Sequence, residues 1–305
     1  MNREGSAGDV KRIMLSRRAL ALALVGISVG GAVQDERQKN YQPSEPNPPE
    51  PPPAGPEPVL PASLPTQPAR PSRDQIIARF GNLKPQRWGL SLPGTATTLN
   101  AGAAGIALTF DCCGGPGGNA WDTKLLDVLR SNGTPAMFFL NSRWVQANPA
   151  LARDIAGDPL FEVGNHGTRH LPLSVSGQSA YGIPGTRNAG EVYDEVMGNQ
   201  DVLTAATGKV PRFFRPGTAY FDDVSIQLVR ALGLIPTDFS LNADGGATFP
   251  AGTVAKTLQS AGEGHIVIAH ANHPLGGTAA GFAKALPVLK SRGAKFVRLS
   301  DSFPA

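Results

Sequence analysis

The chain has 305 residues, which is enough for one large domain or two ordinary ones. Hydrophobic residues make up 41% and charged residues 17%, a composition typical of a globular protein with a substantial core. The formal net charge is +4, but residues 1–33 hold five basic and two acidic side chains, which leaves the rest of the chain near +1. A nearly neutral body lacks the basic surface of nucleic-acid-binding proteins, so that class is excluded.

Residues 1–33 have the form of a secretory signal peptide. Charged residues precede the apolar run 19–33, and cleavage is expected after Ala32. The pair Arg17-Arg18 resembles a twin-arginine export signal, and an ordinary secretory signal is the alternative. Because the run is short for a spanning helix, an uncleaved anchor is the remaining alternative. We expect a periplasmic or secreted protein that meets the membrane only through this segment, if at all.

Residues 34–72 form a proline-rich stretch. Thirteen of the 28 prolines lie between residues 41 and 71, where little apolar surface is available for burial. Such a composition favours an extended polyproline geometry, so a disordered spacer is expected, with a proline-rich ligand motif as the alternative. The folded domain is expected over residues 73–305.

Seven short apolar runs alternate with longer segments in the domain. The longer segments repeat apolar residues every three or four positions, as amphipathic helices do. Strands that alternate with helices form right-handed βαβ units and a parallel sheet, so the pattern predicts an α/β fold, either a barrel or an open doubly wound sheet. The runs are residues 106–110, 136–140, 161–164, 212–215, 234–239, 266–270 and 295–299.

Polar residues interrupt this pattern where the predicted strands end. In βα barrels the carboxyl ends of the strands carry the active site, so these residues are expected to meet at one edge. They are Asp111, Asn165, His166, Arg215, Asp238, Asp244 and His270.

His166 and His170, in the segment NHGTRH, are four residues apart. This spacing would place both imidazoles on one face of a helical turn and suits two bonds to a metal ion. The chain has only five histidines, and this pair follows a buried-looking strand. A divalent metal, most simply zinc, would need a third protein ligand and would keep one position open for water or substrate.

Both cysteines of the chain are adjacent, in the segment TFDCCGGPGG (109–118). An exported chain normally uses cysteines to bridge distant segments. Cys112 and Cys113 could pair only through a strained eight-membered ring, so free thiols packed beneath the glycine-rich loop are expected.

Five segments, in this order, resemble the motifs of the polysaccharide deacetylase family (carbohydrate esterase family 4, the NodB homology domain). The resemblance covers roughly residues 103–300. It implies a distorted (β/α) barrel of about seven parallel strands and metal-dependent removal of acetyl groups from N-acetylated sugars. The segments are TFD (109–111), NHGTRH (165–170), RFFRPG (212–217), an acid after the fifth strand, and IAH (268–270).

The resemblance implies a role for each motif residue. Asp111 matches the general base that takes a proton from the attacking water, and Arg215 matches the arginine that positions this base. His166 and His170 match two metal ligands, and His270 matches the general acid that protonates the departing amine. The ordinary alternatives are a loop cap for Asp111, a structural ion pair for Arg215 and a buried histidine for His270.

Two further positions are assigned less directly. The acid that orients His270 corresponds to Asp238 or Asp244, and we favour Asp244. The backbone N–H near Thr218 would help to stabilise the tetrahedral oxyanion. These roles agree with the chemistry, because amide hydrolysis needs a polarised carbonyl, an activated water and a protonated leaving amine.

The first motif departs from the family pattern TFDDG, whose second aspartate is the third metal ligand. Cys112 stands at that position, and Cys113 stands where glycine would be. Cys112 could bind the metal as a thiolate, Asp122 could fold back to supply a carboxylate, or the metal site could be weakened. We favour Asp122, because a thiolate lowers the Lewis acidity of zinc and glycines 114–118 give the loop freedom.

Loops after the strands offer candidate substrate contacts. Tyr181 and Arg187 lie in the loop 179–188, and His273 and Trp121 follow other strands. Each could contact a sugar. Simple packing is the alternative for Tyr181, Arg187 and Trp121, and termination of a strand is the alternative for His273.

The sequence thus predicts an exported, metal-dependent hydrolase that removes acetyl groups from an N-acetylated polysaccharide such as peptidoglycan or chitin. The alternatives are deacetylation of an O-acetyl ester on a polysaccharide and a carbohydrate-binding pseudoenzyme with a weakened metal site. The sequence predicts no oligomeric state.

Overall fold

The structure, a computed structural model, describes residues 70–304. The predicted signal segment 1–33 and residues 34–69 of the predicted linker lie outside this range. Between residues 70 and 304, no helix combines the length and the apolar character that a membrane crossing requires.

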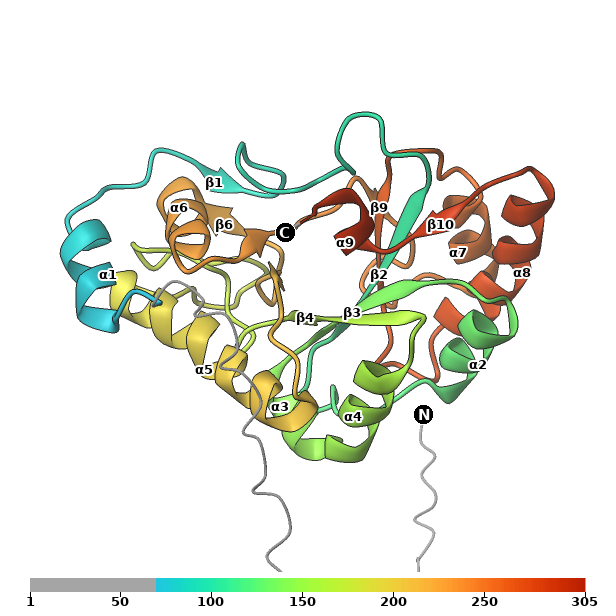
Figure 1. Cartoon of the computed structure of the whole chain (residues 1–305), viewed down its shortest axis with the longest axis horizontal. Helices are drawn as coiled ribbons and strands as arrows, with labels where there is room; N and C mark the ends of the chain where they lie inside the picture. The colour runs from blue at the N-terminus through green and yellow to red at the C-terminus, as the bar shows by residue number, and fades with distance from the viewer. Residues whose placement is uncertain (1–69, 305) are drawn as a thin grey trace, which may run out of the picture. The chain divides into compact units, whose positions relative to one another are not determined.

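A curled parallel sheet forms the centre of the domain (Figure 1). Its strand order is β7-β5-β4-β3-β2-β9-β8, and β10 pairs with the start of β2. All these pairings are parallel, so the α/β fold and the distorted barrel predicted from the sequence are confirmed. The strands are β2 (Ile106–Cys112), β3 (Ala136–Leu140), β4 (Phe161–Asn165), β5 (Phe213–Phe214), β7 (Ile235–Pro236), β8 (Leu241–Asn242), β9 (Ile266–His270) and β10 (Phe296–Val297).

All seven apolar runs contain a strand of this sheet. Three short strands were not predicted: β8, and the antiparallel pair β1 (Trp88–Gly89) and β6 (Phe221–Asp222). Each has two residues, too few for a pattern of alternating or continuous apolar residues to be visible in the sequence.

Helices cover the sheet, and six of them correspond to the amphipathic segments of the sequence. The other three (α1, α3 and α9) have eight residues or fewer. Figure 1 shows α2, α7 and α8 beyond one end of the sheet and α1, α5 and α6 beyond the other. The helices are α1 (Arg73–Phe80), α2 (Thr123–Ser131), α3 (Ser142–Ala147), α4 (Pro149–Gly157), α5 (Ala189–Thr207), α6 (Asp223–Ala231), α7 (Ala251–Leu258), α8 (Thr278–Ser291) and α9 (Leu299–Ser302).

Strand β2 is buried along its whole length, as expected for an interior strand of a parallel sheet. Its even-numbered residues, from Ile106 to Cys112, pack into the apolar core beneath α2, α7 and α8. Its odd-numbered residues point to the opposite face, because side chains alternate along a strand. There Ala107 packs with Phe139 and Phe213, and Asp111 lies at the carboxyl end of the same face. This alternation decides which side chains of the first motif reach the site.

Candidate active site

A cavity of about 400 Å³ opens at the carboxyl ends of the strands. Residues from four of the predicted motifs line it, together with loop residues between them. Among them are Asp111, Cys113, His170, Thr218, Tyr181 and His270. The prediction that polar strand ends meet at one edge therefore agrees with the geometry.

Asp111 and Arg215 form a buried ion pair beneath this cavity. Arg215 Nη1 donates to Asp111 Oδ1 at 2.8 Å, and Nη2 donates to Thr109 Oγ1 and to the carbonyl of Asp238, both at 2.9 Å. The guanidinium lies over the ring of Phe139, 4.3 Å from its centroid. Burial alone would raise the pKa of Asp111, but His166, Arg215 and His270 together hold this pKa below its ordinary value. Asp111 is therefore ionised and fixed in orientation.

His166 follows β4 directly and is fully buried beside this pair. Its Nδ1 lies 2.9 Å from the carbonyl oxygen of Arg215. A carbonyl can only accept, so Nδ1 carries the hydrogen and Nε2 of the neutral ring presents a lone pair. The Nε2 atom lies 3.6 Å from Asp111 Oδ2; burial alone would lower the pKa of His166, but this carboxylate and Cys113 raise it. The second nitrogen of the ring is thus free to bind a cation.

His170 lies against His166, with ring centroids 4.9 Å apart and planes at 86°. Its Nε2 is buried and has no hydrogen-bond partner among the described residues. Its backbone adopts a φ of +64°, in the left-handed region. The ring rests on Gly217, where an added Cβ would lie 2.4 Å from His170, so only glycine fits there.

The segment from His166 to His170 is not the helical turn expected from the spacing but an irregular loop. Gly167 and His170 both have positive φ, which a helical turn excludes. The side-chain amide of Asn141 donates to the carbonyls of His166 and Gly167, at 3.0 and 2.7 Å. Side chains outside the loop therefore bring the two imidazoles together, in place of helical periodicity.

Glu195 of α5 is the second support of this loop, and sequence analysis did not identify it. Its carboxylate accepts hydrogen bonds from the backbone N–H groups of Arg169 and Leu171, at 3.0 and 3.2 Å. Burial raises the pKa of Glu195. Asn165 adds a further contact, because its Oδ1 accepts from the N–H of Gly167 at 2.9 Å. The only signal in the sequence was an acid on the otherwise buried face of a predicted helix.

Asp244 and His270 form the second polar pair of the cavity. The Nδ1 of His270 donates to Asp244 Oδ1 at 3.0 Å, and its backbone N–H donates to Oδ2 at 2.7 Å. Thr278 Oγ1 also donates to Oδ2, at 2.9 Å. Burial alone would lower the pKa of His270, but Asp244 and the sulfur of Cys113 raise this pKa well above its ordinary value. Of the two acids considered for this partnership, the structure places Asp244 against His270.

Asp238 lies behind Arg215 instead. Its carboxylate accepts from the backbone N–H groups of Ser91, at 2.6 Å, and of Phe239, at 3.0 Å. Burial raises the pKa of Asp238 to about 6. It does not line the cavity, so its contacts are those of a structural carboxylate.

The structure departs from both expectations for the third metal ligand. Cys112 is fully buried in the apolar core, because the pleat of β2 turns it away from the site. Asp122 caps α2, where its Oδ1 accepts from the N–H of Leu125 at 3.2 Å. Within residues 70–304, the group of side chains that could hold a metal ion consists of Cys113, His166 and His170. Sequence reasoning missed Cys113, whose only signal was its spacing of two residues from Asp111.

The candidate substrate contacts fall into two groups. Thr218 and Tyr181 line the cavity, whereas Arg187 lies on the surface in an ion pair with Glu191. His273 is half-buried beside His270, with ring centroids 6.4 Å apart, and does not line the cavity. Trp121 packs on Phe138 and Trp144, which is the packing alternative.

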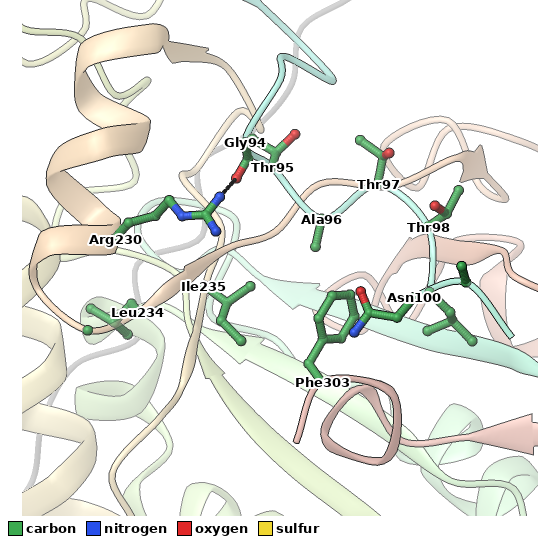
Figure 2. Close-up of a pocket in the computed structure, with 13 residues that line it drawn as sticks. Gly94, Thr95, Ala96, Thr97, Thr98, Asn100, Arg230, Leu234, Ile235 and Phe303 are labelled. Atoms are coloured by element: carbon green, nitrogen blue, oxygen red, sulfur yellow. Dashed lines mark hydrogen bonds between the residues drawn. The ribbon is translucent and has the colours of Figure 1, made fainter. Parts of the chain in front are cut away.

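A larger cavity of about 680 Å³ lies near the amino ends of the strands (Figure 2). Its wall includes the segment 94–101, Arg230, Ile235 and Phe303. Arg230 donates to the carbonyl of Gly94 at 3.0 Å, so its guanidinium is hydrogen-bonded to another part of the cavity wall. The described residues that line it include neither a histidine, a cysteine nor a carboxylate, and so we assign the chemistry to the smaller cavity.

Comparison with known proteins agrees with this fold. Residues 99–236 match the family model described as polysaccharide deacetylase. This region is similar to the polysaccharide deacetylase family, carbohydrate esterase family 4, whose members are hydrolases.

Two relatives of similar sequence are named as peptidoglycan deacetylases. The chain is 29% identical over 199 residues to the peptidoglycan-N-acetylglucosamine deacetylase PgdA of Listeria monocytogenes. This match covers 65% of the chain but only 38% of the length of PgdA. The chain is 28% identical over 200 residues to a peptidoglycan-N-acetylglucosamine deacetylase of Bacillus cereus, which covers 64% of this chain and 86% of the relative. A carbohydrate esterase family 4 pseudoenzyme from Bacillus anthracis has the same fold, with a TM-score of 0.58 at 22% identity over 69% of each chain.

Proposed function

We propose that this chain removes acetyl groups from an N-acetylated glycan of the peptidoglycan or chitin type. The observation that carries the proposal is the pair of acid–base partnerships, Asp111 with Arg215 and Asp244 with His270, in one cavity with His170. The two relatives named as peptidoglycan-N-acetylglucosamine deacetylases support the choice of glycan.

His166 and His170 suit a divalent metal ion, with zinc as the expected one. The Nε2 of His166 has its lone pair free, and the Nε2 of His170 is buried without a partner in residues 70–304. The carboxylate of Asp111 lies beside His166, so a positive charge is favourable there. When bound, such an ion polarises an acetyl carbonyl and makes a nearby water acidic.

Asp111 would act as general base. Its Oδ1 is held by Arg215, which leaves Oδ2 on the side of the two histidines. Because Arg215 keeps the carboxylate ionised, Asp111 can accept a proton from the water that attacks the carbonyl. The carbonyl carbon then becomes tetrahedral, and the backbone N–H near Thr218, a residue that lines the cavity, would help to stabilise the oxyanion.

His270 would act as general acid. Asp244 accepts from its Nδ1 and so favours the protonated ring. The other nitrogen can then give a proton to the amine as the carbon–nitrogen bond breaks. Base and acid are thus supplied by separate strands, β2 and β9, which pair directly.

Tyr181 would bind the sugar chain at the mouth of the cavity. Tyr181 is 73% exposed. Its backbone has a φ of +53°, which is unfavourable for a tyrosine. Tyr220 meets the ring edge-on at 5.4 Å between centroids, and Trp88 lies 5.5 Å from Tyr220. An exposed aromatic ring held by others is suited to packing against the apolar face of a sugar. His273, further along the β9 loop, is proposed as an outer contact.

We also propose that the chain works outside the cytoplasm. The form of residues 1–33 and the proline-rich stretch after it support export with a spacer before the domain. The glycan named for the relatives belongs to the cell wall, which agrees with a periplasmic or secreted site of action.

The test measures acetate release by the full chain, purified under reducing conditions and loaded with Zn²⁺. N-acetylated peptidoglycan and chitooligosaccharides are the expected substrates, and acetylated xylan is the O-acetyl arm. Release from the first two that is abolished by Asp111→Asn would support the proposal. Release from xylan alone would indicate an esterase. Binding of glycan without acetate release from any substrate would indicate the pseudoenzyme and refute the proposal.

A further inference from the structure

Cys113 and the two histidines bring three potential ligand atoms together. These atoms all lie within 4.8 Å of one another, and Cys113 Sγ is 3.9 Å from His166 Nε2. A tetrahedral zinc with ordinary Zn–S and Zn–N bond lengths holds sulfur and nitrogen about 3.6 Å apart. The separation of Cys113 Sγ and His166 Nε2 therefore differs from that of a zinc site by only a few tenths of an ångström.

The two histidines each turn one ring nitrogen toward this point, and Asp111 Oδ2 lies 3.6 Å from that of His166. The Nδ1 of His166 is engaged by the carbonyl of Arg215, which leaves the Nε2 lone pair on the side of Cys113. The Nε2 of His170 is buried and unpartnered in the described part of the chain. Ring nitrogens and a thiol that converge in a buried space are typical of a site for a cation.

The other candidates for a third ligand are committed elsewhere. Cys112 belongs to the apolar core on the opposite face of β2. Asp122 uses one carboxylate oxygen as the cap of α2. Its second oxygen is buried and unpartnered, but Asp122 is not part of the group formed with the histidines. Cys113 is the residue that the fold brings to them.

We infer that the thiolate of Cys113 is the third protein ligand of the metal ion held by His166 and His170, in place of a carboxylate. The inference rests on the proposed function for the presence of a metal ion in this cavity. A set of one sulfur and two nitrogen ligands selects zinc and cobalt(II) over magnesium and calcium, which prefer oxygen. Three protein ligands also leave a fourth position open to substrate.

The test records the ultraviolet absorption of the metal-free full chain after reloading with Co²⁺, because a cobalt–thiolate bond adds a charge-transfer band. We expect this band in the wild type and its loss in Cys113→Ser. The affinity of Cys113→Ser for Zn²⁺ should fall by at least roughly 10- to 100-fold, the scale on which even indirect changes to metal sites act. Cys112→Ala is the matched control, and both band and affinity should persist in it.

Cys113→Asp is a second variant, which separates loss of the thiolate from a failure to fold. It supplies a carboxylate at the same place, so it should bind Zn²⁺, be stabilised by it against thermal unfolding, and lack the cobalt band. A band that survives in Cys113→Ser or Cys113→Asp would overturn the inference. So would loss of the band in Cys112→Ala, or an Asp122→Asn variant that loses as much Zn²⁺ affinity as Cys113→Ser.

Acetate release by the same zinc-loaded samples separates this inference from the proposed function. A cobalt band that depends on Cys113, without acetate release, would leave the ligand assignment intact and refute the deacetylase. Acetate release without a cobalt band would refute the ligand assignment and leave the deacetylase intact.

Discussion

Two regions of the cavity are built in different ways. The floor consists of Asp111, His166, Arg215, Asp244 and His270, which lie at strand ends and are largely or fully buried. The rim consists of Thr218 and Tyr181, which lie in loops and line the cavity, and Tyr181 is 73% exposed. Floor side chains are each fixed by a hydrogen-bonded partner, whereas the exposed ring of Tyr181 meets Tyr220 edge-on. A preorganised floor suits the chemical step, and an exposed rim suits the binding of a long and variable chain.

The largest expected effect is on Asp111. Asp111→Asn should lower kcat by about 10²- to 10⁴-fold, because the amide cannot accept the proton. It should also reduce stability, since the buried charge of Arg215 loses its partner. Acetate release and thermal unfolding check the two effects. Near-normal kcat in this variant would contradict the assignment of the floor residues to the chemical step.

His270→Gln should lower kcat by about 10²-fold, because the leaving amine is no longer protonated. His270 is outside the ligand group, so bound zinc should stay at the wild-type level. Elemental analysis beside the acetate assay tests both statements. Loss of zinc from this variant would mean that His270 also helps to hold the metal ion, and would contradict its separate role as an acid.

Asp238 tests whether every acid near the floor takes part in chemistry. Its pKa is about 6 in the folded chain, above the ordinary value, so the folded state binds a proton more tightly than the unfolded state. The contribution to stability is therefore complete below about pH 4 and is lost as the pH rises through 6. This loss amounts to about 3 kcal/mol.

Asp238→Asn should remove this part of the pH dependence, as measured by denaturant unfolding from pH 4 to 7. It should also weaken the fold by about 1–3 kcal/mol, because one of two backbone N–H groups loses its acceptor. In the folded variant kcat should stay within a few-fold of the wild type. A loss of kcat like that of Asp111→Asn would place Asp238 in the chemistry.

The smallest expected effect is on the rim. Tyr181→Ala should raise KM for a glycan oligomer by about 2- to 10-fold and leave kcat nearly unchanged, because an aromatic contact contributes about 0.5–1.5 kcal/mol. Tyr181→Phe, which keeps the ring, is the control and should retain the wild-type KM. An equal fall in kcat and in kcat/KM would contradict the assignment of Tyr181 to binding.

Most of the floor could be predicted from the sequence, because its residues follow buried strands whose apolar runs are easy to see. Asp111, His166, Arg215 and His270 each end or follow such a run. The position of Cys113 was missed for a local reason: the pleat of β2 sends Cys112 into the core, and only the register of the sheet reveals it.

The loop that joins the histidines was also misjudged. Spacing of four residues predicted a helical turn, but hydrogen bonds to Asn141 and Glu195 impose another path. Such contacts join positions 25 and 26 residues apart, and no local pattern encodes them. The rim was predicted least well, because Tyr181 reaches the cavity whereas Arg187, six residues later, does not.

The support of the histidine loop by Glu195 has a consequence for the order of assembly. The loop leaves β4, but its geometry depends on α5 and, through the carbonyl of Arg215, on β5, both of which follow it in the chain. A chain made from its amino end therefore contains both imidazoles well before it can hold them in place. Capture of the metal ion would come late, after β5 has joined the sheet. A bound ion would then mark a chain whose first five helices and strands β2 to β5 are already in place.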